Sequence, residues 1–392
     1  MRPSARVQAA IEILDKVIEA ARSQGAPADR ILADWSRGNR YAGSKDRRAV
    51  REHVYAAIRA CGEVPSSGRA AMLRVAEEEP ELAALFDGSQ YGPAAIAEGE
   101  AVADGGVAPE WIEDRLIAAD IPEEEAAALL GRAPLDLRVN TLRADPDTLG
   151  LPEEAEQLQV PNALRLPAGT QVEQWPAFRD GLIEVQDAGS QTACLAVGAQ
   201  PGELVIDLCA GAGGKTLSLA AAMRNEGTLI ACDTDRGRLS RLAPRAERAG
   251  AEIADTVLMN PGKEMDALTG WVGQADAVLV DAPCSGTGTW RRNPEARWRL
   301  SPGELLRLVK LQERLLGIAA QLVKPGGRLV YVTCSLIDEE GAGQVDRFLA
   351  ANPRFHTETL QLPLGRPRGK GIRLTPHHDG TDGFFIASLS CT

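Results

Sequence analysis

The stretch LVIDLCAGAGGKT, residues 204–216, decides the fold of this chain. Its first residues are apolar and predict a buried strand, its glycines predict a tight turn, and the residues after the turn open a helical segment. Further apolar runs follow at residues 228–233, 252–258, 275–283 and 327–335, with helical segments between them. Strands that alternate with helices in this way predict an α/β, doubly wound sheet.

The rest of the chain is organised around this sheet. Apolar residues recur at helical spacing in residues 4–23 and 46–61, so residues 1–130 are predicted to form an all-α domain. Residues 131–180 contain a short strand-like alternation and are predicted to form a small α+β connector. Residues 181–392 are then the doubly wound domain, with a helix that begins at a capping box at Ser301 and two closing strands within residues 355–362 and 383–389.

Composition and cysteine usage exclude several classes of protein. The 392 residues are 44% hydrophobic, which is enough for more than one core. The seven cysteines include no C-x-x-C pair, which argues against a disulfide framework and against a structural metal site. The first thirty residues lack the apolar core of a signal peptide, and no later run reaches membrane-spanning length. We therefore expect a cytoplasmic protein with no metal and no membrane partner.

Charge is distributed unevenly along the chain. The net charge is -12, but residues 77–125 alone hold fifteen acidic residues and one basic residue, a local net charge of -14, and the rest of the chain is close to neutral. Basic residues gather around Arg48 in the N-terminal part and again at Arg291 and Arg292. Either cluster can be ordinary solvated surface or a site for phosphate groups.

The glycine-rich turn after the first strand predicts a nucleotide-like ligand. The phosphate-binding P-loop pattern fails because Cys209 stands where it requires glycine, and the dinucleotide pattern that starts at Gly211 and Gly213 meets Thr216 where a third glycine is expected. The end of the next strand, however, has an acid, Asp233, which can accept both hydroxyls of a ribose. S-adenosylmethionine fits best, because it has a ribose and no phosphate; a turn that binds nothing is the alternative.

Two cysteines follow neighbouring strands of the predicted sheet. Cys284 lies just after Asp281, and Cys334 lies at the end of the last parallel strand, so all three side chains should meet at the carboxyl edge. A thiolate beside a methyl donor is suited to methylation of cytosine C5, because its addition to C6 turns the ring into an enamine that can attack. Asp281 is suited to assist protonation near N3 as the thiolate adds. Cys284 is suited to remove the C5 proton as the thiolate is expelled. Two small buried side chains are the alternative.

These motifs together resemble the RsmB/NOP2/Sun family of RNA cytosine-C5 methyltransferases. The resemblance covers residues 130–392 through LRVNTLR (137–143), VQDAGSQ (185–191), DLCAGAGGKT (207–216), DAPCSGTGTWRRNP (281–294), YVTCS (331–335) and DGFFIASL (382–389). Residues 45–59 also resemble the NusB-like RNA-binding domain of the bacterial RsmB/Sun ribosomal RNA branch. The resemblance implies a seven-stranded, Rossmann-like, class I methyltransferase domain that uses S-adenosylmethionine.

The resemblance also implies roles for individual residues. It makes Cys334 the nucleophile, lets Cys284 assist product release and gives Asp281 a catalytic role. It assigns RNA contacts to Arg291, Arg292 and Arg48. The cofactor contacts that it implies are Cys209, Ala210, Gly211, Ala212, Gly213, Gly214, Lys215, Asp233, Arg238, Asn260 and Asp281, with Asn260 in the place of the acid that usually lies near the adenine.

The sequence therefore predicts a monomeric enzyme, an S-adenosylmethionine-dependent RNA cytosine-C5 methyltransferase that acts on small-subunit (16S) ribosomal RNA through a covalent cysteine adduct. Three alternatives are open. The substrate can be transfer RNA, the chain can be a non-catalytic RNA-binding assembly factor on the same scaffold, or the substrate can be DNA, in which case Cys284 would be the attacking thiol.

Overall fold

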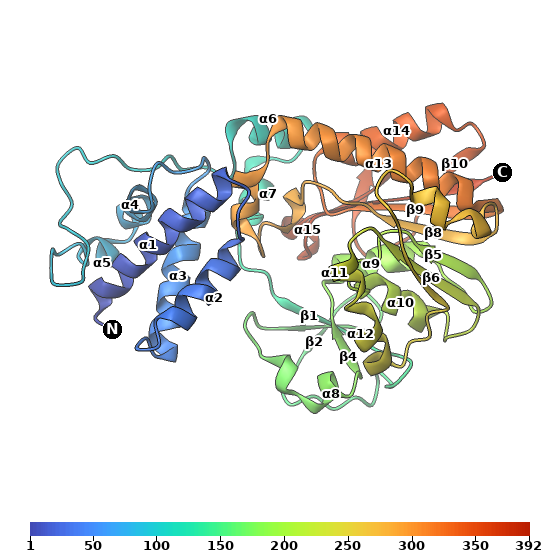
Figure 1. The fold of residues 1–392 in the computed structure, drawn as a ribbon, viewed down its shortest axis with the longest axis horizontal. Coiled ribbons are helices and arrows are strands. Elements are labelled where there is room, and N and C mark those ends of the chain that lie inside the picture. The colour runs from blue at the N-terminus through green and yellow to red at the C-terminus, as the bar shows by residue number, and fades with distance from the viewer. The chain divides into compact units, whose positions relative to one another are not determined.

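The apolar segments from residue 204 onward form one nine-stranded sheet in the computed structural model, which describes residues 1–392 (Figure 1). Seven of its strands are those expected from the sequence, and the α/β, doubly wound class is confirmed. The other two, β11 and β12, form a hairpin of short strands. The strands are β5 (Leu204–Asp207), β6 (Thr228–Asp233), β7 (Asp255–Leu258), β8 (Ala275–Asp281), β9 (Val323–Thr333), β10 (Phe355–Glu358), β11 (Arg366–Arg368), β12 (Gly371–Leu374) and β13 (Phe384–Cys391).

Strand order places a topological switch at the centre of this sheet. The order is β11-β12-β13-β9-β8-β5-β6-β7, and β10 pairs with the second half of β13. Strands β5 to β9 are parallel to their neighbours, and β13 is antiparallel to β9. The chain proceeds from β5 to β6 and β7 on one side, and then returns to β8 and β9 on the other. Ligands of such sheets bind at the carboxyl ends of the strands next to this switch.

Both faces of the sheet are covered because successive apolar side chains along each strand point to opposite faces. Ile206 packs on the face covered by α13 and α14, whereas Val205 packs on the face covered by α9 and α10. The helical segments of this part are α9 (Ala188–Val197), α10 (Gly214–Ala222), α11 (Arg236–Leu239), α12 (Leu242–Ala249), η2 (Glu264–Ala267), η3 (Thr269–Trp271), η4 (Thr287–Thr289), α13 (Pro302–Leu322), η6 (Asp338–Glu340), α14 (Ala342–Ala351) and α15 (Pro376–Asp379).

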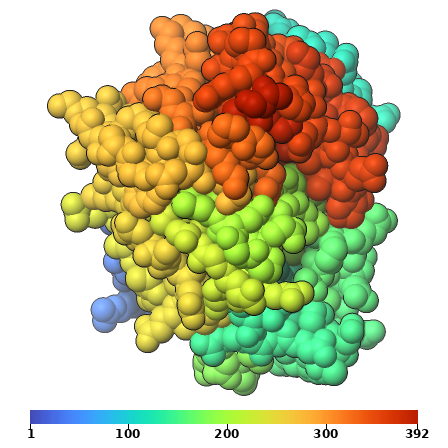
Figure 2. All heavy atoms as spheres, turned by 90° about the vertical axis from the view of Figure 1, so that its right-hand side faces the viewer, coloured from blue at the N-terminus to red at the C-terminus, as the bar shows by residue number.

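A small antiparallel sheet precedes the large one and forms the predicted α+β connector. Its strand order is β2-β3-β1-β4, and it extends past the predicted boundary at residue 180 because β4 is its edge strand. In Figure 2 the connector, coloured teal to green, lies directly beside the yellow-green atoms of the following residues. Its elements are β1 (Leu135–Val139), β2 (Glu156–Gln157), β3 (Ala163–Leu166), η1 (Val172–Gln174), α8 (Pro176–Arg179) and β4 (Ile183–Val185).

The chain divides into two compact units. The first is Met1–Gly131 with Thr289–Ser301, and the second is Arg132–Gly288 with Pro302–Thr392. The first unit is all-helical, as expected for its N-terminal part, and its likeness to NusB stays a prediction. No helix of either unit has the length and apolar character needed to cross a membrane. The helices of the first unit are α1 (Pro3–Arg22), α2 (Ala28–Gly38), α3 (Ser44–Ala60), α4 (Gly68–Glu78), α5 (Pro80–Ala83), α6 (Glu110–Ala118), α7 (Glu123–Ala128) and η5 (Pro294–Arg299).

The segment Thr289–Ser301 joins the first unit through buried contacts. Trp298 packs into the core formed by α1, α3 and α4. Arg297 is fully buried and donates hydrogen bonds to the backbone carbonyls of Ile58, at 2.6 Å, and Cys61, at 2.8 Å. The last carbonyls of a helix have no partner within the helix, so this guanidinium satisfies the C-terminal end of α3. The predicted range of the doubly wound domain, residues 181–392, is thus interrupted by a segment that folds elsewhere.

Candidate functional site

A cavity of about 490 Å³ lies at the carboxyl ends of the parallel strands of the second unit. Its walls come from the ends of β5, β6, β7, β8 and β9 and from α13. The predicted site residues that line it are Cys209, Asp233, Arg238, Asp281, Cys284 and Cys334. Parallel strands end at one edge of a sheet, which explains how residues more than one hundred positions apart come to share one cavity.

The two predicted cysteines are in contact inside this cavity. Strands β8 and β9 are parallel neighbours, and Asp281 lies opposite Val332, so both strands end at the same level. The loop after each strand then places the Sγ atoms of Cys284 and Cys334 at a distance of 3.3 Å. This is within hydrogen-bonding distance for sulfur, and one thiol is able to donate its proton to the other.

The surroundings of Cys284 favour its protonated form. The hydrogen bond with Cys334, together with burial and the charges of Cys334 and Glu340, raises the pKa of Cys284 well above that of an ordinary thiol. Cys284 therefore keeps its proton at neutral pH.

A buried carboxylate holds the loop that carries Cys284. Glu340 is fully buried and accepts hydrogen bonds from the backbone N–H of Ser285, at 2.9 Å, from the Ser285 hydroxyl and from the Gln312 amide, at 2.9 Å. The same Gln312 amide also donates to the carbonyl of Pro283 at 2.9 Å. The hydroxyls of Ser285 and Ser335 lie 3.1 Å apart, so the loops of the two cysteines are tied to one another.

Lys215 contacts the third predicted catalytic residue. Its Nζ atom donates to Oδ2 of Asp281 at 2.7 Å, and it also lies over the ring of Phe384. Burial opposes the charge of Lys215, but Asp281 outweighs that penalty and the pKa of Lys215 is raised. The sequence-based interpretation made Lys215 a cofactor contact; the structure shows it as the ionic partner of Asp281 and does not place it among the residues that line the cavity.

The glycine-rich turn orients Asp233. The backbone N–H groups of Gly211 and Asp235 each donate to one oxygen of this carboxylate, both at 2.7 Å. Gly211 has φ of +56°, and a Cβ atom there would lie 2.6 Å from the guanidinium of Arg238. Gly213 has φ of +86°, and a Cβ atom there would lie 2.1 Å from Leu242. Any larger residue would have a strained backbone and a clashing Cβ atom at both positions, so both need glycine.

The remaining predicted cofactor residues fall into two groups. Ala210, Ala212 and Gly214 belong to the turn but do not line the cavity. Asn260 is exposed and also lies outside the cavity lining, so the structure does not bring it to the place expected of it. Sequence reasoning missed Glu264, which does line the cavity. The sequence feature that could have identified Glu264 is its place in the loop after the third strand, in "NPGKE", four residues after Asn260.

The predicted RNA-contacting arginines belong to the first unit. Arg291 is buried, with 7% of its surface exposed, whereas Arg292 is exposed. Arg48 is exposed on α3 and lines a separate cavity of about 330 Å³ between α2 and α3, together with Arg47 and Arg51. Of the predicted RNA contacts, Arg48 and Arg292 are therefore exposed and Arg291 is buried.

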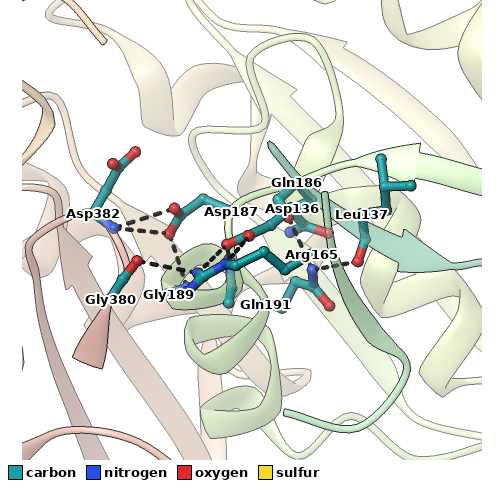
Figure 3. Close-up of polar contacts among 10 residues, drawn as sticks. Asp136, Leu137, Arg165, Gln186, Asp187, Gly189, Gln191, Gly380 and Asp382 are labelled. Atoms are coloured by element: carbon teal, nitrogen blue, oxygen red, sulfur yellow. Dashed lines mark hydrogen bonds and ion pairs between the residues drawn. The ribbon is translucent and has the colours of Figure 1, made fainter. Parts of the chain in front are cut away.

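Residues of the motif VQDAGSQ and of strands β1 and β3 lie outside the cavity lining and connect neighbouring segments of the second unit. Arg165 of β3 forms a bidentate pair with Asp136 of β1, at 2.7 and 2.9 Å, and also donates to the carbonyl of Gly380 (Figure 3). Asp187 caps α9 through the N–H of Gly189, at 2.8 Å, and accepts from the N–H of Asp382 (Figure 3). These bonds attach the connector and the start of α9 to the loop that leads into β13.

In comparisons with known proteins, the chain is similar to methyltransferases of small-subunit ribosomal RNA. A family model described as 16S rRNA methyltransferase RsmB/F matches residues 194–390. Ribosomal RNA small subunit methyltransferase B of Sodalis glossinidius is 33% identical over 332 residues, a match that covers 80% of this chain and 74% of that protein. Probable ribosomal RNA small subunit methyltransferase B of a Synechocystis species is 36% identical over 272 residues, covering 65% of this chain and 59% of that protein.

Solved structures have a similar fold over all or most of the chain. The crystal structure of PH0851 is 26% identical, has a TM-score of 0.76 and is covered over 99% of its length, with 100% of this chain matched. A methyltransferase homolog protein from Pyrococcus horikoshii is 27% identical, with a TM-score of 0.60, and the match covers 72% of this chain and 99% of that one.

Proposed function

The chain belongs to the 16S rRNA methyltransferase RsmB/F family, and we propose that it transfers a methyl group from S-adenosylmethionine to C5 of a cytosine in small-subunit ribosomal RNA. The observation that supports this most directly is the pair of thiols, 3.3 Å apart, beside Asp281 at the carboxyl edge of the sheet. Methylation at oxygen or nitrogen needs no such pair, because those atoms have lone pairs that attack without prior activation of a ring.

The residues of the cavity fit S-adenosylmethionine. The two backbone N–H groups orient the Asp233 carboxylate and leave lone pairs that can accept the ribose hydroxyls. A volume of about 490 Å³ lies within the range of small-molecule sites. When bound, the cofactor would supply a methyl group on a positively charged sulfur. Cys209 and Arg238 line the same cavity.

Cys334 begins the proposed reaction. Its thiolate adds to C6 of cytosine, and the pair of electrons displaced from the C5–C6 bond makes C5 nucleophilic enough to take the methyl group. Asp281 assists by a hydrogen bond at the N3 edge of the base as the thiolate adds. Its ion pair with Lys215 fixes the direction of the carboxylate before the base arrives.

Cys284, once its own proton has passed to solvent, completes the reaction by removing the C5 proton. The electrons of the C5–H bond re-form the C5–C6 double bond while the bond between Cys334 and C6 breaks, and Cys334 leaves as a thiolate. The pKa of Cys284 is raised first of all by its hydrogen bond with Cys334 and also by the charge on Cys334. Both causes disappear once Cys334 is bonded to carbon. Addition of Cys334 therefore lowers the pKa of Cys284 at the stage when Cys284 must act as a base.

Contact with RNA is proposed for the first unit. The arginines around the α2–α3 cavity offer positive charge in a chain with a net charge of -12, and Arg48 and Arg292 are exposed. Charge of this sign binds phosphate regardless of base sequence. A cytosine held in a helix would have to leave its stack before it reaches the thiols. The cytoplasmic location and monomeric state stay predictions.

The covalent step can be tested by trapping it. We expect the Cys284→Ala variant, incubated with S-adenosylmethionine and small-subunit RNA that lacks the modification, to give a protein–RNA band on a denaturing gel, because the adduct forms and is not released. The Cys334→Ala variant should give none. A band with Cys334→Ala alone would reverse the two roles, and no band with either variant would favour a non-catalytic RNA-binding factor.

A further inference from the structure

Three consecutive residues lead into β13 and contact different segments of the second unit. The backbone N–H of Asp382 donates to both oxygens of the Asp187 carboxylate, at 3.2 and 3.1 Å (Figure 3). The N–H of Gly383 donates to the carbonyl of Gly288 at 2.8 Å. Phe384 is the first residue of β13, and only 5% of its surface is exposed. The backbone is therefore fixed at two points directly before this buried ring.

The segment that carries Phe384 lies beside the loops of the paired thiols. Gly288, besides its contact with this segment, donates its own N–H to the carbonyl of Cys334 at 3.0 Å. In the sheet Phe385 lies opposite Thr333, so Phe384 lies at the level where β9 ends and Cys334 follows. Cys334 packs against the apolar cluster to which Phe384 belongs. The ring is thus held at the carboxyl edge of the sheet.

The ring of Phe384 packs against a glycine and lies under a cation. A Cβ atom on Gly189, at the start of α9, would lie 2.7 Å from a ring atom of Phe384, so the ring occupies the space that a side chain would need there. The Nζ atom of Lys215 lies over the ring, 5.5 Å from its centroid. The ring quadrupole attracts an ammonium at such a distance, and more strongly where water is excluded.

Lys215 has two partners that together fix its ammonium group. Its Nζ atom donates to Oδ2 of Asp281 at 2.7 Å, and the ring of Phe384 is the second partner. A lysine ammonium is a compact charge on a flexible stem of four carbons, so one ion pair leaves it free to swing around its acceptor. A second attraction from the ring removes that freedom. The direction of the Asp281 carboxylate then depends on both contacts.

We propose that Phe384 is a positioning residue for methyl transfer: its ring fixes the Lys215 ammonium and so the direction in which Asp281 meets the N3 edge of the base. The inference rests on the proposed function, because the role of Asp281 is assigned there. It also gives the motif VQDAGSQ a purpose, because Asp187 and Gly189 determine where the ring lies.

Replacement of Phe384 in the full chain by phenylalanines with one, two or three ring fluorines tests this. Each fluorine withdraws electron density from the face of the ring and weakens its attraction for a cation, while the shape of the ring changes little. The single-turnover rate of methyl transfer to unmodified small-subunit RNA should fall with each fluorine, by about tenfold over the series. The dissociation constant for S-adenosylmethionine, measured by calorimetry, should not change, because neither Phe384 nor Lys215 lines the cavity.

The same three substitutions at Phe348 are the matched control. Phe348 is a buried residue of α14 whose ring packs against the ring of Phe355 rather than under a cation. Fluorines there should leave the rate unaltered. If the variant with three fluorines at Phe384 failed to fold, the variants with one and two would still decide the result.

Each departure from these results overturns a distinct statement. A rate that does not respond to fluorines at Phe384 would overturn its role, and so would an equal fall in rate with fluorines at Phe348, since packing would then be the cause. Cofactor affinity that fell in step with the rate would overturn the positioning of Asp281 by placing the effect in cofactor binding. Wild type that transfers no methyl group to the RNA would overturn the proposed function itself, and the role of Phe384 with it.

Discussion

Asp207 shows how the environment of one side chain sets its charge in this fold. It ends β5 directly beneath the glycine-rich turn and is fully buried, and its Oδ2 atom accepts from the hydroxyl of Thr216 at 2.7 Å. Burial raises the pKa of Asp207 to about 7, against the smaller opposing effect of the Thr216 hydrogen bond. The residue is therefore partly protonated at neutral pH, and it supports the turn without lining the cavity.

This pKa predicts a pH dependence of stability. Between pH 4 and 7 the unfolded chain releases the Asp207 proton while the folded chain retains it, so this residue lowers the free energy of unfolding as pH rises through that window. Asp207→Asn, which does not ionise, should avoid the loss. Its free energy of unfolding relative to wild type should rise by about 2 to 3 kcal/mol from pH 5 to pH 8. Urea unfolding at the two values measures this.

The control for that experiment is Thr216→Val, which removes the donor to Asp207 and retains the carboxyl group. Its free energy of unfolding should fall, and more so at pH 8 than at pH 5, because the ionised carboxylate depends more on the hydrogen bond. A difference between Asp207→Asn and wild type that is the same at both pH values would show that Asp207 does not titrate in this range.

At the scale of elements, two strand ends and the loops that follow them make the site. The sequence was sufficient to predict that Cys284 and Cys334 meet, because two apolar runs with a helix between them predict parallel neighbours that end at one edge. It was not sufficient for the Lys215–Asp281 pair or for Glu264. Those depend on side-chain contacts between separate elements, here α10 with β8 and η2 with α13. The β11–β12 hairpin was missed because its strands are only three and four residues long.

The Glu340→Gln variant tests how strongly catalysis depends on the position of the loop that carries Cys284. Glu340→Gln places an amide where three donors now meet, so at least one hydrogen bond to the Cys284 loop is lost. We expect kcat to fall by about 10- to 100-fold, because a small displacement of a reacting group has an effect of this size. The dissociation constant for S-adenosylmethionine should not change, since Glu340 does not line the cavity. Steady-state kinetics and calorimetry separate the two effects.

Glu358→Gln is the matched control for Glu340→Gln. It makes the same chemical change at an exposed position on β10 and should leave both kcat and cofactor affinity unaltered. If Glu340→Gln retained wild-type kcat, or if it weakened cofactor binding to the same extent as it lowered kcat, the loop-positioning role of Glu340 would be contradicted.

At the scale of the whole molecule, the chain passes between the two units three times. Thr289–Ser301 lies in sequence between β8 and α13 of the second unit and folds with the first. The sequence did not predict this, because the arginines in this segment were interpreted as solvated surface or as contacts to RNA phosphates, whereas Arg297 is buried against the end of α3. Burial lowers the pKa of Arg297 to about 10, so it remains charged at neutral pH. The loop that follows Cys284 is thereby anchored at its far end in the helical unit.

Arg297→Met tests this anchor. Methionine preserves much of the apolar stem but leaves the carbonyls of Ile58 and Cys61 without their donor. The free energy of unfolding should fall by about 2 to 4 kcal/mol, as measured by urea denaturation followed by circular dichroism. Arg30→Met, at an exposed position on α2, should change it by less than about 0.5 kcal/mol. Equal effects of the two substitutions would mean that Arg297 does not anchor the segment.

The central claim is that this chain methylates C5 of cytosine in small-subunit ribosomal RNA with its paired thiols. The most direct measurement is mass spectrometry of nucleosides from small-subunit RNA that lacks the modification, after incubation with the purified chain and methyl-labelled S-adenosylmethionine. We predict label in 5-methylcytidine with wild type and none with Cys334→Ala. Label in another nucleoside, or equal 5-methylcytidine from both proteins, would contradict the account.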